Sequence, residues 1–288
     1  MNSIMLIDKP EGITSQDAVT LVKRRAGAKK AGHTGTLDPI ATGLLIVCLN
    51  EATKLSRFML DLPKNYYTVL KLGERTDTYD AEGKIIARAE IPGREKIEQV
   101  LGAFRGKIKQ VPPMFSALKI AGTPLYELAR KGMEVEREPR DIEIYSLELA
   151  DYNPPYAGLS IKCSRGAYVR SLADDIGIAA GSFAHIKALR RTGIGPFNVE
   201  NAISPDGIEK GFSPEGGCAH ILNIDSALSF MEELELDQIS AARARNGAPF
   251  KVARPAYGFV RLKTRDGALV GIGEARGTMV RVERLFNL

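Results

Sequence analysis

Cysteine is scarce in this chain. Its 288 residues include only Cys48, Cys163 and Cys218, which lie far apart in the sequence. None belongs to a C-x-x-C pair that could ligate a metal ion, and an odd number of cysteines argues against a disulfide framework. We therefore interpret all three as reduced thiols.

Long apolar segments are absent as well. No run reaches the roughly 20 consecutive apolar residues that a membrane span needs. The N-terminal sequence MNSIMLIDKPEG places charges directly after a short apolar run, unlike a signal peptide. We expect a cytoplasmic protein with no membrane association.

The common cofactor and hydrolase motifs are also missing. The chain has no G-x-x-x-x-G-K-[ST] loop, and its sequence GIGEARG carries Arg276 where a dinucleotide-binding loop has its third glycine. Its three histidines are scattered and form no H-E-x-x-H, and no serine lies in G-x-S-x-G. The sequence therefore predicts no cofactor and no metal.

Positive charge is concentrated in two places, although the net charge is only +5. Residues 235–288 hold ten basic and five acidic side chains, which accounts for the whole surplus. A second cluster consists of Lys23, Arg24, Arg25, Lys29 and Lys30. A single basic run is often only solvated surface, but two runs together favour a polyanionic partner, namely nucleic acid.

Hydrophobic patterning predicts an α+β fold. Strands are expected over residues 4–7, 44–49, 66–72, 85–87, 142–149 and 159–163, and helices after the cap residue Thr14, around residues 97–104, and over residues 169–178 and 219–231. Because strands and helices interleave irregularly, a mixed or antiparallel sheet is favoured over a doubly wound one.

The C-terminal residues predict a separate module. Residues 233–288 are short and punctuated by glycine, with strands expected over 258–263, 268–273 and 279–285, as in a small β-barrel. We place the domain boundary between residues 232 and 233, so that residues 1–232 form the main domain.

A carboxylate stands out in the glycine- and threonine-rich segment AGHTGTLDPIATG, residues 31–43. Pro39 fixes its own backbone and biases Asp38 away from helix, so this carboxylate is held in an extended geometry beside a predicted buried strand. A positioned carboxylate can react. On these residues alone, a turn-capping role for Asp38 stays open, because Asp-Pro is a common turn dipeptide.

The segment GHTGTLDPIATGLL, residues 32–45, resembles the signature of the bacterial tRNA pseudouridine(55) synthase family, TruB. Four further segments resemble motifs of this family in the same order: LIDKPEGITSQDAV, KNYYTVLKLGERTDTYDAEG, CSRGAYVRSLADDIG and AHIKALRRTGIGPF. The resemblance implies a pseudouridine-synthase-like catalytic domain that isomerises a uridine in the T-loop of tRNA without a cofactor. In length, charge and glycine spacing, residues 233–288 resemble the family's PUA-like RNA-binding domain.

The resemblance also implies roles for individual residues. Asp38 matches the catalytic nucleophile, and Arg170 matches the cation that keeps it ionised. Tyr66 matches the tyrosine that stacks on the flipped base and is a proposed base for the C5 proton, while Tyr168 and Leu189 match other pocket positions. His33 matches the histidine that contacts RNA near the flipped nucleotide. Candidate phosphate contacts are Lys23, Arg24, Arg25, Lys29, Lys30, Arg190 and Arg191.

Simpler interpretations stand beside several of these roles. Arg170 alone would be taken for a solvated arginine at a helix end, Leu189 for a core residue, and His33 for a structural histidine. Asp77 and Asp80 lie in a polar hairpin, so turn chemistry explains them without a catalytic role.

Two rival functions remain open beside tRNA pseudouridine synthesis. One rival is a noncatalytic RNA-binding or chaperone protein with the same fold. The other is a metal-assisted phosphodiesterase using Asp38, Asp77 and Asp80, although their spacing is not that of a metal site. We expect the T-arm of tRNA as the partner, no obligate protein partner, and a monomer.

Overall fold

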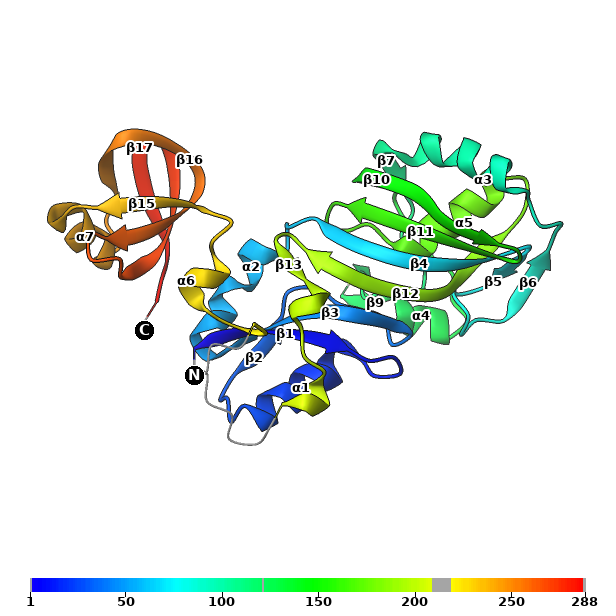
Figure 1. Ribbon diagram of the computed structural model, residues 1–288, viewed down its shortest axis with the longest axis horizontal. Helices are drawn as coiled ribbons and strands as arrows, with labels where there is room; N and C mark the ends of the chain where they lie inside the picture. Colours follow the sequence, from blue (N-terminus) through cyan, green and yellow to red (C-terminus); the bar gives the residue numbers. More distant parts are fainter. Residues whose placement is uncertain (1, 121, 209–218, 287–288) are drawn as a thin grey trace.

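The computed structural model describes residues 2–120, 122–208 and 219–286. It is built around a sheet of ten strands that runs the length of the larger part of the molecule (Figure 1). The strands of the main path, in spatial order, are β14 (Ile221–Asn223), β1 (Ser3–Lys9), β3 (Ala41–Leu49), β12 (Ala184–Ile194), β4 (Lys64–Leu72), β11 (Tyr156–Cys163), β10 (Arg140–Asn153) and β7 (Gly106–Gln110). β2 (Ala31–His33) pairs with β3, and β13 (Phe197–Asn198) pairs with β12.

The sheet is mixed, as predicted. Its neighbouring strands pair antiparallel except β3 and β12, which run parallel at the centre. Helices α3 and α5 pack on one face of this sheet and share a hydrophobic core with it. The predicted α+β class is therefore confirmed.

The remaining elements are short. The helices are α1 (Ser15–Arg25), α2 (Ser56–Met59), α3 (Arg94–Leu101), α4 (Leu125–Arg130), α5 (Val169–Ala179), α6 (Ile224–Ala227) and α7 (Gln238–Arg245). Two hairpins are formed by β5 (Glu74–Thr76) with β6 (Ile85–Arg88), and by β8 (Lys119–Ile120) with β9 (Thr123–Pro124). Short 3-10 helices cover Asn50–Leu55, Gly102–Phe104, Val199–Asn201 and Pro205–Gly207.

Local sequence explains where α1 begins. The Thr14 hydroxyl accepts the amide of Asp17 at 3.1 Å, and the Asp17 carboxylate accepts the amide of Thr14 at 3.0 Å, which completes a capping box. Ala18, Val19 and Val22 then point into the core against β1 and β3. The helix therefore fixes the chain that leads into the glycine-rich segment.

The helix predicted over residues 219–231 is wrong. Its first part is the edge strand β14, which pairs with β1, and only α6 is helical. The Asn223 side chain accepts the amide of Ser226 at 2.7 Å and caps this short helix. Pairing along the free edge of β1 prevails over helix propensity here.

The C-terminal module is β-rich. β15 (Glu232–Leu236) pairs parallel with β16 (Phe250–Thr264), which pairs antiparallel with β17 (Leu269–Leu285). The two strands predicted over 268–273 and 279–285 form the single strand β17. The predicted boundary after residue 232 lies at the first residue of β15, and it stays a prediction.

The module docks on α2 at one end of the sheet (Figure 1). The rings of Phe58 and Phe259 meet edge to face with centroids 4.9 Å apart. Arg57 forms an ion pair of 2.6 Å with Glu283, and Ile272 shares the core cluster of β1 and β3. These contacts join the module to the main domain.

Two cysteines can be assigned. Cys48 and Cys163 are buried free thiols, and Cys218 lies outside the described residues. None of the helices described is long and apolar enough to cross a membrane.

Candidate active site

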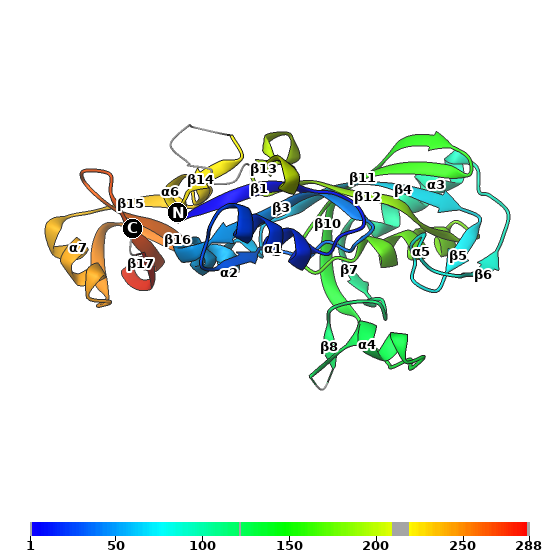
Figure 2. The same cartoon turned by 90° about the horizontal axis from the view of Figure 1, so that it is seen from below.

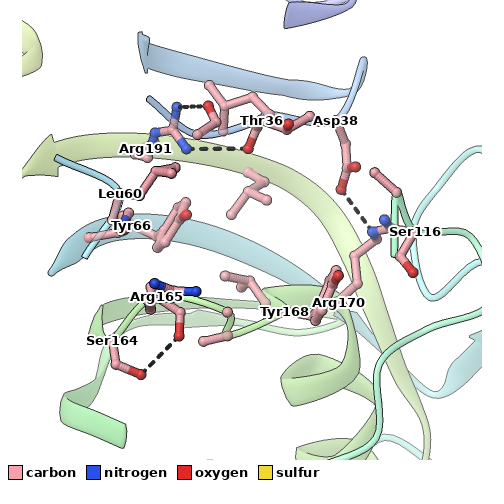
Figure 3. A pocket seen from close by; sticks show the side chains of 18 of the residues that line it. Thr36, Asp38, Leu60, Tyr66, Ser116, Ser164, Arg165, Tyr168, Arg170 and Arg191 are labelled. Atoms are coloured by element: carbon pink, nitrogen blue, oxygen red, sulfur yellow. Dashed lines mark hydrogen bonds and ion pairs between the residues drawn. The ribbon is translucent and has the colours of Figure 1, made fainter. Parts of the chain in front are cut away.

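A cavity of about 610 Å³ opens at the centre of the sheet, where β4 and β12 meet the N-terminus of α5 (Figure 3). Its lining includes five residues that the sequence predicts for the site: Asp38, Tyr66, Tyr168, Arg170 and Leu189. These residues come from a loop, two strands and a helix that are far apart in the sequence.

Asp38 lies on the loop between β2 and β3. The side-chain hydroxyl of Ser15, the first residue of α1, donates to the Leu37 carbonyl at 3.0 Å and accepts the Leu37 amide at 2.8 Å. The amide of Ala41 donates to the Asp38 carbonyl at 3.0 Å. Backbone bonds on both sides thus hold the Asp38 carboxylate, whose side chain is 37% exposed, at the cavity.

Arg170 is the cation beside this carboxylate. Its Nε lies 2.9 Å from Asp38 Oδ2, and its Nη1 lies 3.6 Å from Asp80 Oδ2. Nη2 donates to the Phe115 carbonyl at 2.7 Å, and Nη1 donates to the Thr78 carbonyl at 3.3 Å. The residue is 5% exposed, so the interpretation as a solvated helix-end arginine is wrong.

Asp80 is a residue whose contribution the sequence analysis missed. It is 4% exposed, and its other carboxylate oxygen accepts the Thr78 hydroxyl at 2.6 Å. It does serve the turn, as predicted, but it also faces the Arg170 guanidinium. Arg170 is therefore held between two carboxylates, of which only Asp38 lines the cavity that contains Tyr66.

Arg191 holds the loop of Asp38 through backbone carbonyls. It is 1% exposed, and it donates to the carbonyls of Leu44 at 2.7 Å, Thr36 at 3.3 Å and Gly35 at 3.0 Å. Its Nε, Nη1 and Nη2 each donate to a backbone carbonyl. These bonds and the burial of the side chain argue against the phosphate contact predicted for Arg191. Its backbone lies opposite Gly43, where an added Cβ would come within 2.3 Å of the Arg191 carbonyl oxygen.

Tyr66 and Leu189 are two of the apolar and aromatic residues that line the cavity. Tyr66 is the strand partner of Arg191, and burial raises the pKa of its phenol, with the Arg191 charge opposing that rise. Tyr67 points to the other face of the sheet, close to Gly158. Leu189 is 7% exposed, so it is both a core residue and a lining residue.

Tyr168 is positioned through its backbone. Its amide donates to Gln110 Oε1 at 2.8 Å, and its carbonyl accepts from Gln110 Nε2 at 3.0 Å. This pair of bonds fixes the residue immediately before α5, and hence the start of the helix that carries Arg170.

His33 lines a second cavity of about 560 Å³, which shares Asp38 and Arg170 with the first. Its Nδ1 accepts the amide of Gly35 at 3.3 Å, and burial lowers the pKa of the imidazole, helped by the Arg191 charge. Tyr126 and Arg130 of α4 form another part of this cavity. In Figure 2, α4 and β8 project from the body of the molecule.

The basic residues of the first cluster differ in their surroundings. Lys23, Arg24, Lys29 and Lys30 are exposed near the C-terminal end of α1. Arg25 instead forms an ion pair with Asp206 at 2.9 Å.

Arg190 is also engaged with the protein. Its guanidinium makes two bonds to the Asp8 carboxylate, at 3.0 and 2.7 Å, and the side chain is 40% exposed.

The metal-dependent rival finds no geometric support in the described ranges, where no three His, Cys, Asp or Glu side chains are grouped to hold a metal ion. Asp77 accepts the amide of Lys84 at 2.8 Å within its own hairpin, while Asp80 faces Arg170. Asp38 and Asp80 thus share the Arg170 guanidinium, and Asp77 bonds within its own hairpin.

Residues 23–169 match the model described as TruB family pseudouridylate synthase (N terminal domain), and residues 170–229 match the tRNA pseudouridylate synthase B C-terminal domain. The chain belongs to the TruB family. The resemblance inferred from the motifs is therefore confirmed.

Individual TruB-family relatives match nearly the whole chain. The tRNA pseudouridine synthase B of Pseudomonas paraeruginosa is 44% identical over 279 residues, which cover 95% of this chain and 92% of that protein. The protein of the same name from Mannheimia succiniciproducens is 42% identical over 295 residues, which cover 100% and 97%.

Solved structures share the fold. A chain in the crystal structure of a Cbf5-Nop10-Gar1 complex superposes with a TM-score of 0.76 at 26% identity, covering 98% of this chain and 84% of that one. A chain in the structure of an H/ACA RNP bound to a substrate RNA containing 2'-deoxyuridine gives 0.73 at 24% identity, covering 99% and 85%.

Proposed function

We propose that this TruB-family protein converts a uridine in the T-loop of tRNA to pseudouridine, with Asp38 as the nucleophile and with no cofactor. The supporting observation is the Asp38 carboxylate, held by the buried Arg170 at a cavity that Tyr66 and Leu189 line. Family membership and the names of the two relatives point to the same reaction.

The cavity suits a nucleoside. Its volume of about 610 Å³ lies in the range of about 300–1,000 Å³ typical of small-ligand sites. A uridine stacked in folded RNA must leave its stack to enter, and it would then be gripped by ring stacking and polar contacts. Tyr66 offers the ring, and Leu189 offers an apolar surface beside it.

The chemistry requires breaking the bond from C1' of the ribose to N1 of uracil and rejoining the base through C5. A carboxylate nucleophile divides this reaction into easier steps, because it can form and later release a covalent adduct. The Arg170 guanidinium lies 2.9 Å from Asp38 Oδ2 and holds this carboxylate at the cavity. In this scheme Tyr66 first loses its own proton to solvent and then accepts the C5 proton as the phenolate, a form that the Arg191 charge favours against the effect of burial.

RNA binding is assigned to the exposed basic residues. Lys23, Arg24, Lys29 and Lys30 are the stronger candidates for phosphate contact, because Arg25 and Arg190 already have carboxylate partners. His33, in the second cavity, would contact RNA near the flipped nucleotide. The C-terminal module, residues 233–288, would act as a PUA-like RNA-binding domain.

We further propose that the protein acts on tRNA in the cytoplasm as a monomer, without an obligate protein partner. The chain itself contributes the nucleophile, its cation and the stacking ring. Gel filtration of the purified chain with multi-angle light scattering would test the monomer.

The decisive experiment follows tritium release from C5-labelled uridine in a tRNA T-arm. The wild-type protein is expected to release tritium and to modify one T-loop position. Asp38→Asn is expected to bind the RNA and to release none. Absence of release by the wild type would support the noncatalytic RNA-binding rival, and near-normal turnover by Asp38→Asn would overturn the role of Asp38.

A further inference from the structure

Two lysines are buried beside the active-site loop, and they differ in their hydrogen bonds. Lys9 is 0% exposed, and its Nζ donates to the carbonyls of Pro10 and Ile13 at 2.8 Å and of Pro39 at 3.3 Å. Each of its three protons therefore has an acceptor. Lys9 is a structural residue that ties β1 to the loop of Asp38.

Lys64 is buried but lacks such a set of acceptors. It is 7% exposed, and its Nζ donates to the carbonyl of Leu60. Across the described part of the chain, it has no other hydrogen-bond acceptor and no carboxylate within ion-pair distance. An ammonium has three donors, so two remain for a ligand.

Lys64 lies at the wall of the cavity in which the reaction is proposed to occur. It is the first residue of β4, two residues before Tyr66, so both side chains lie on the same face of the strand. Lys64 and Tyr66 both line the cavity that contains Asp38. Figure 3 shows Tyr66 across the cavity from Asp38 and Arg170. If the ribose of a bound uridine faced Asp38, its base would extend toward Tyr66.

A buried cation with spare donors is costly unless an anion or a polar group reaches it. The burial of Lys64 lowers its pKa to about 8, and the Arg191 charge adds to this effect. The amine thus stays mostly protonated at neutral pH. The other buried cation at the cavity, Arg170, is paired with the carboxylates of Asp38 and Asp80. Lys64 has no carboxylate within ion-pair distance.

We propose that the Lys64 ammonium binds a carbonyl oxygen of the everted uracil and stabilises the negative charge that the base acquires when its bond to the ribose breaks. In that step the electron pair of the C1'–N1 bond moves to the base and spreads over N1 and the carbonyl oxygens. When C5 then bonds to C1', the Asp38 carboxylate is released, the C5 proton passes to Tyr66, and N1 takes up a proton. Lys64 keeps its own proton throughout. The inference rests on the proposed function.

The experiment compares Lys64→Met and Lys64→Arg with the wild type in single-turnover reactions on a T-arm RNA. Lys162→Met is the matched control, because Lys162 is an exposed lysine on the neighbouring strand β11. Removing a donor to developing charge costs about 10²-fold or more in rate. We expect a loss of about 100-fold for Lys64→Met with RNA affinity within about twofold, partial recovery in Lys64→Arg, and no change in Lys162→Met.

A second substrate tests the leaving-group role itself. Fluorine at C5 withdraws electrons and makes the base a better leaving group. The deficit of Lys64→Met, measured as the rate of substrate loss, should therefore shrink to about tenfold on RNA that carries 5-fluorouridine at the target. Equal deficits on the two substrates, or a deficit that lies in RNA affinity, would overturn the proposal in favour of a phosphate contact.

The pH profile adds an independent readout. The wild-type rate should fall above pH 8, as Lys64 loses its proton, and Lys64→Arg should hold its rate to higher pH. The other groups around Lys64 are Asp61, Arg165, Cys163, Arg191 and Tyr66, and all of them are present in Lys64→Arg as well. Burial raises the pKa of Cys163 to about 12, and burial also raises the pKa of Tyr66. Lys9 is present in both proteins and cancels in the comparison. Superimposable profiles would overturn the assignment.

Failure of the wild type to release tritium would refute the proposed function and not Lys64 in particular. A normal rate in folded Lys64→Met, with an active wild type, would refute the role of Lys64 alone. Urea unfolding of each variant establishes that it is folded, and Lys64→Arg keeps the test available if the methionine variant is not.

Discussion

Replacing Gly43 with alanine should disturb the active-site loop through the backbone alone. Gly43 has φ +100° and lies opposite Arg191 where β3 and β12 run parallel. A Cβ there would come within 2.3 Å of the Arg191 carbonyl oxygen, whereas ordinary contact begins at 3.4 Å. The two strands must therefore separate by about 1 Å.

The magnitude can be worked from two terms. Alanine at positive φ costs about 1–2 kcal/mol, of which about 0.4–1 kcal/mol is offset by a less flexible unfolded chain. Overpacking of a filled interior adds about 1–3 kcal/mol. We expect Gly43→Ala to lower the free energy of unfolding by about 3 kcal/mol.

Gly106→Ala is the matched control. Gly106 has φ +82° in the same sheet, but a Cβ there meets nothing within 4 Å. It should lose only the backbone term, about 1 kcal/mol. The difference between the two variants isolates the steric contact.

Activity should separate the variants further. Arg191 bonds the carbonyls of Gly35 and Thr36, so a shift of its strand moves the Asp38 loop. A misplacement of about 1 Å can cost about 10²-fold in rate. Urea unfolding and single-turnover tritium release measure the two effects. Equal unfolding midpoints for Gly43→Ala and Gly106→Ala, or wild-type turnover by Gly43→Ala, would refute this reasoning.

Three further outcomes are expected. Asp80→Asn should slow single turnover about tenfold with unchanged RNA affinity, because the second carboxylate on Arg170 is lost; an unchanged rate would show that Asp38 alone orients the guanidinium. Burial raises the pKa of Asp175 to about 6, whereas the pKa in the unfolded chain is near the ordinary 3.8. Between these two values the native state holds a proton that the unfolded chain has lost, so the free energy of unfolding of the wild type falls as pH rises from about 4 to 6. Asp175→Asn should therefore be more stable by about 1–2 kcal/mol above pH 6 and lack this slope in urea unfolding; parallel pH profiles would contradict it. Replacing Lys29 and Lys30 by alanine should reduce the salt dependence of RNA binding by about 1–2 in log–log slope, measured by fluorescence anisotropy, and an unchanged slope would remove them from the phosphate contacts.

Several elements could be predicted because their signals are local. The capping residues Thr14 and Asp17 fix the start of α1 within four residues of chain. The apolar run over residues 44–49, which forms most of β3, has no polar residue to expose and is buried throughout. Pro39 likewise biases its neighbour Asp38 toward extended backbone. Such features are decided by neighbours in the sequence, and the sequence is sufficient for them.

Prediction was less successful where a distant strand or charge decides the outcome. Residues 221–223 read as helix, yet they pair with β1 because that edge is free only in the folded sheet. Asp80 read as a turn residue, and only the folded chain brings it to Arg170.

The sequence by itself determined the family and the presence of a basic, β-rich C-terminal module, and it singled out Asp38 as the carboxylate proposed to react. The tertiary structure decided which basic side chains bond within the protein. Arg191 donates to backbone carbonyls, Arg190 pairs with Asp8, and Lys64 donates to a single carbonyl at the cavity wall. The physical reason is that a residue's charge is visible in the sequence, but its burial and its partners depend on the folded chain, which for Arg190 and Arg191 joins residues more than a hundred positions apart.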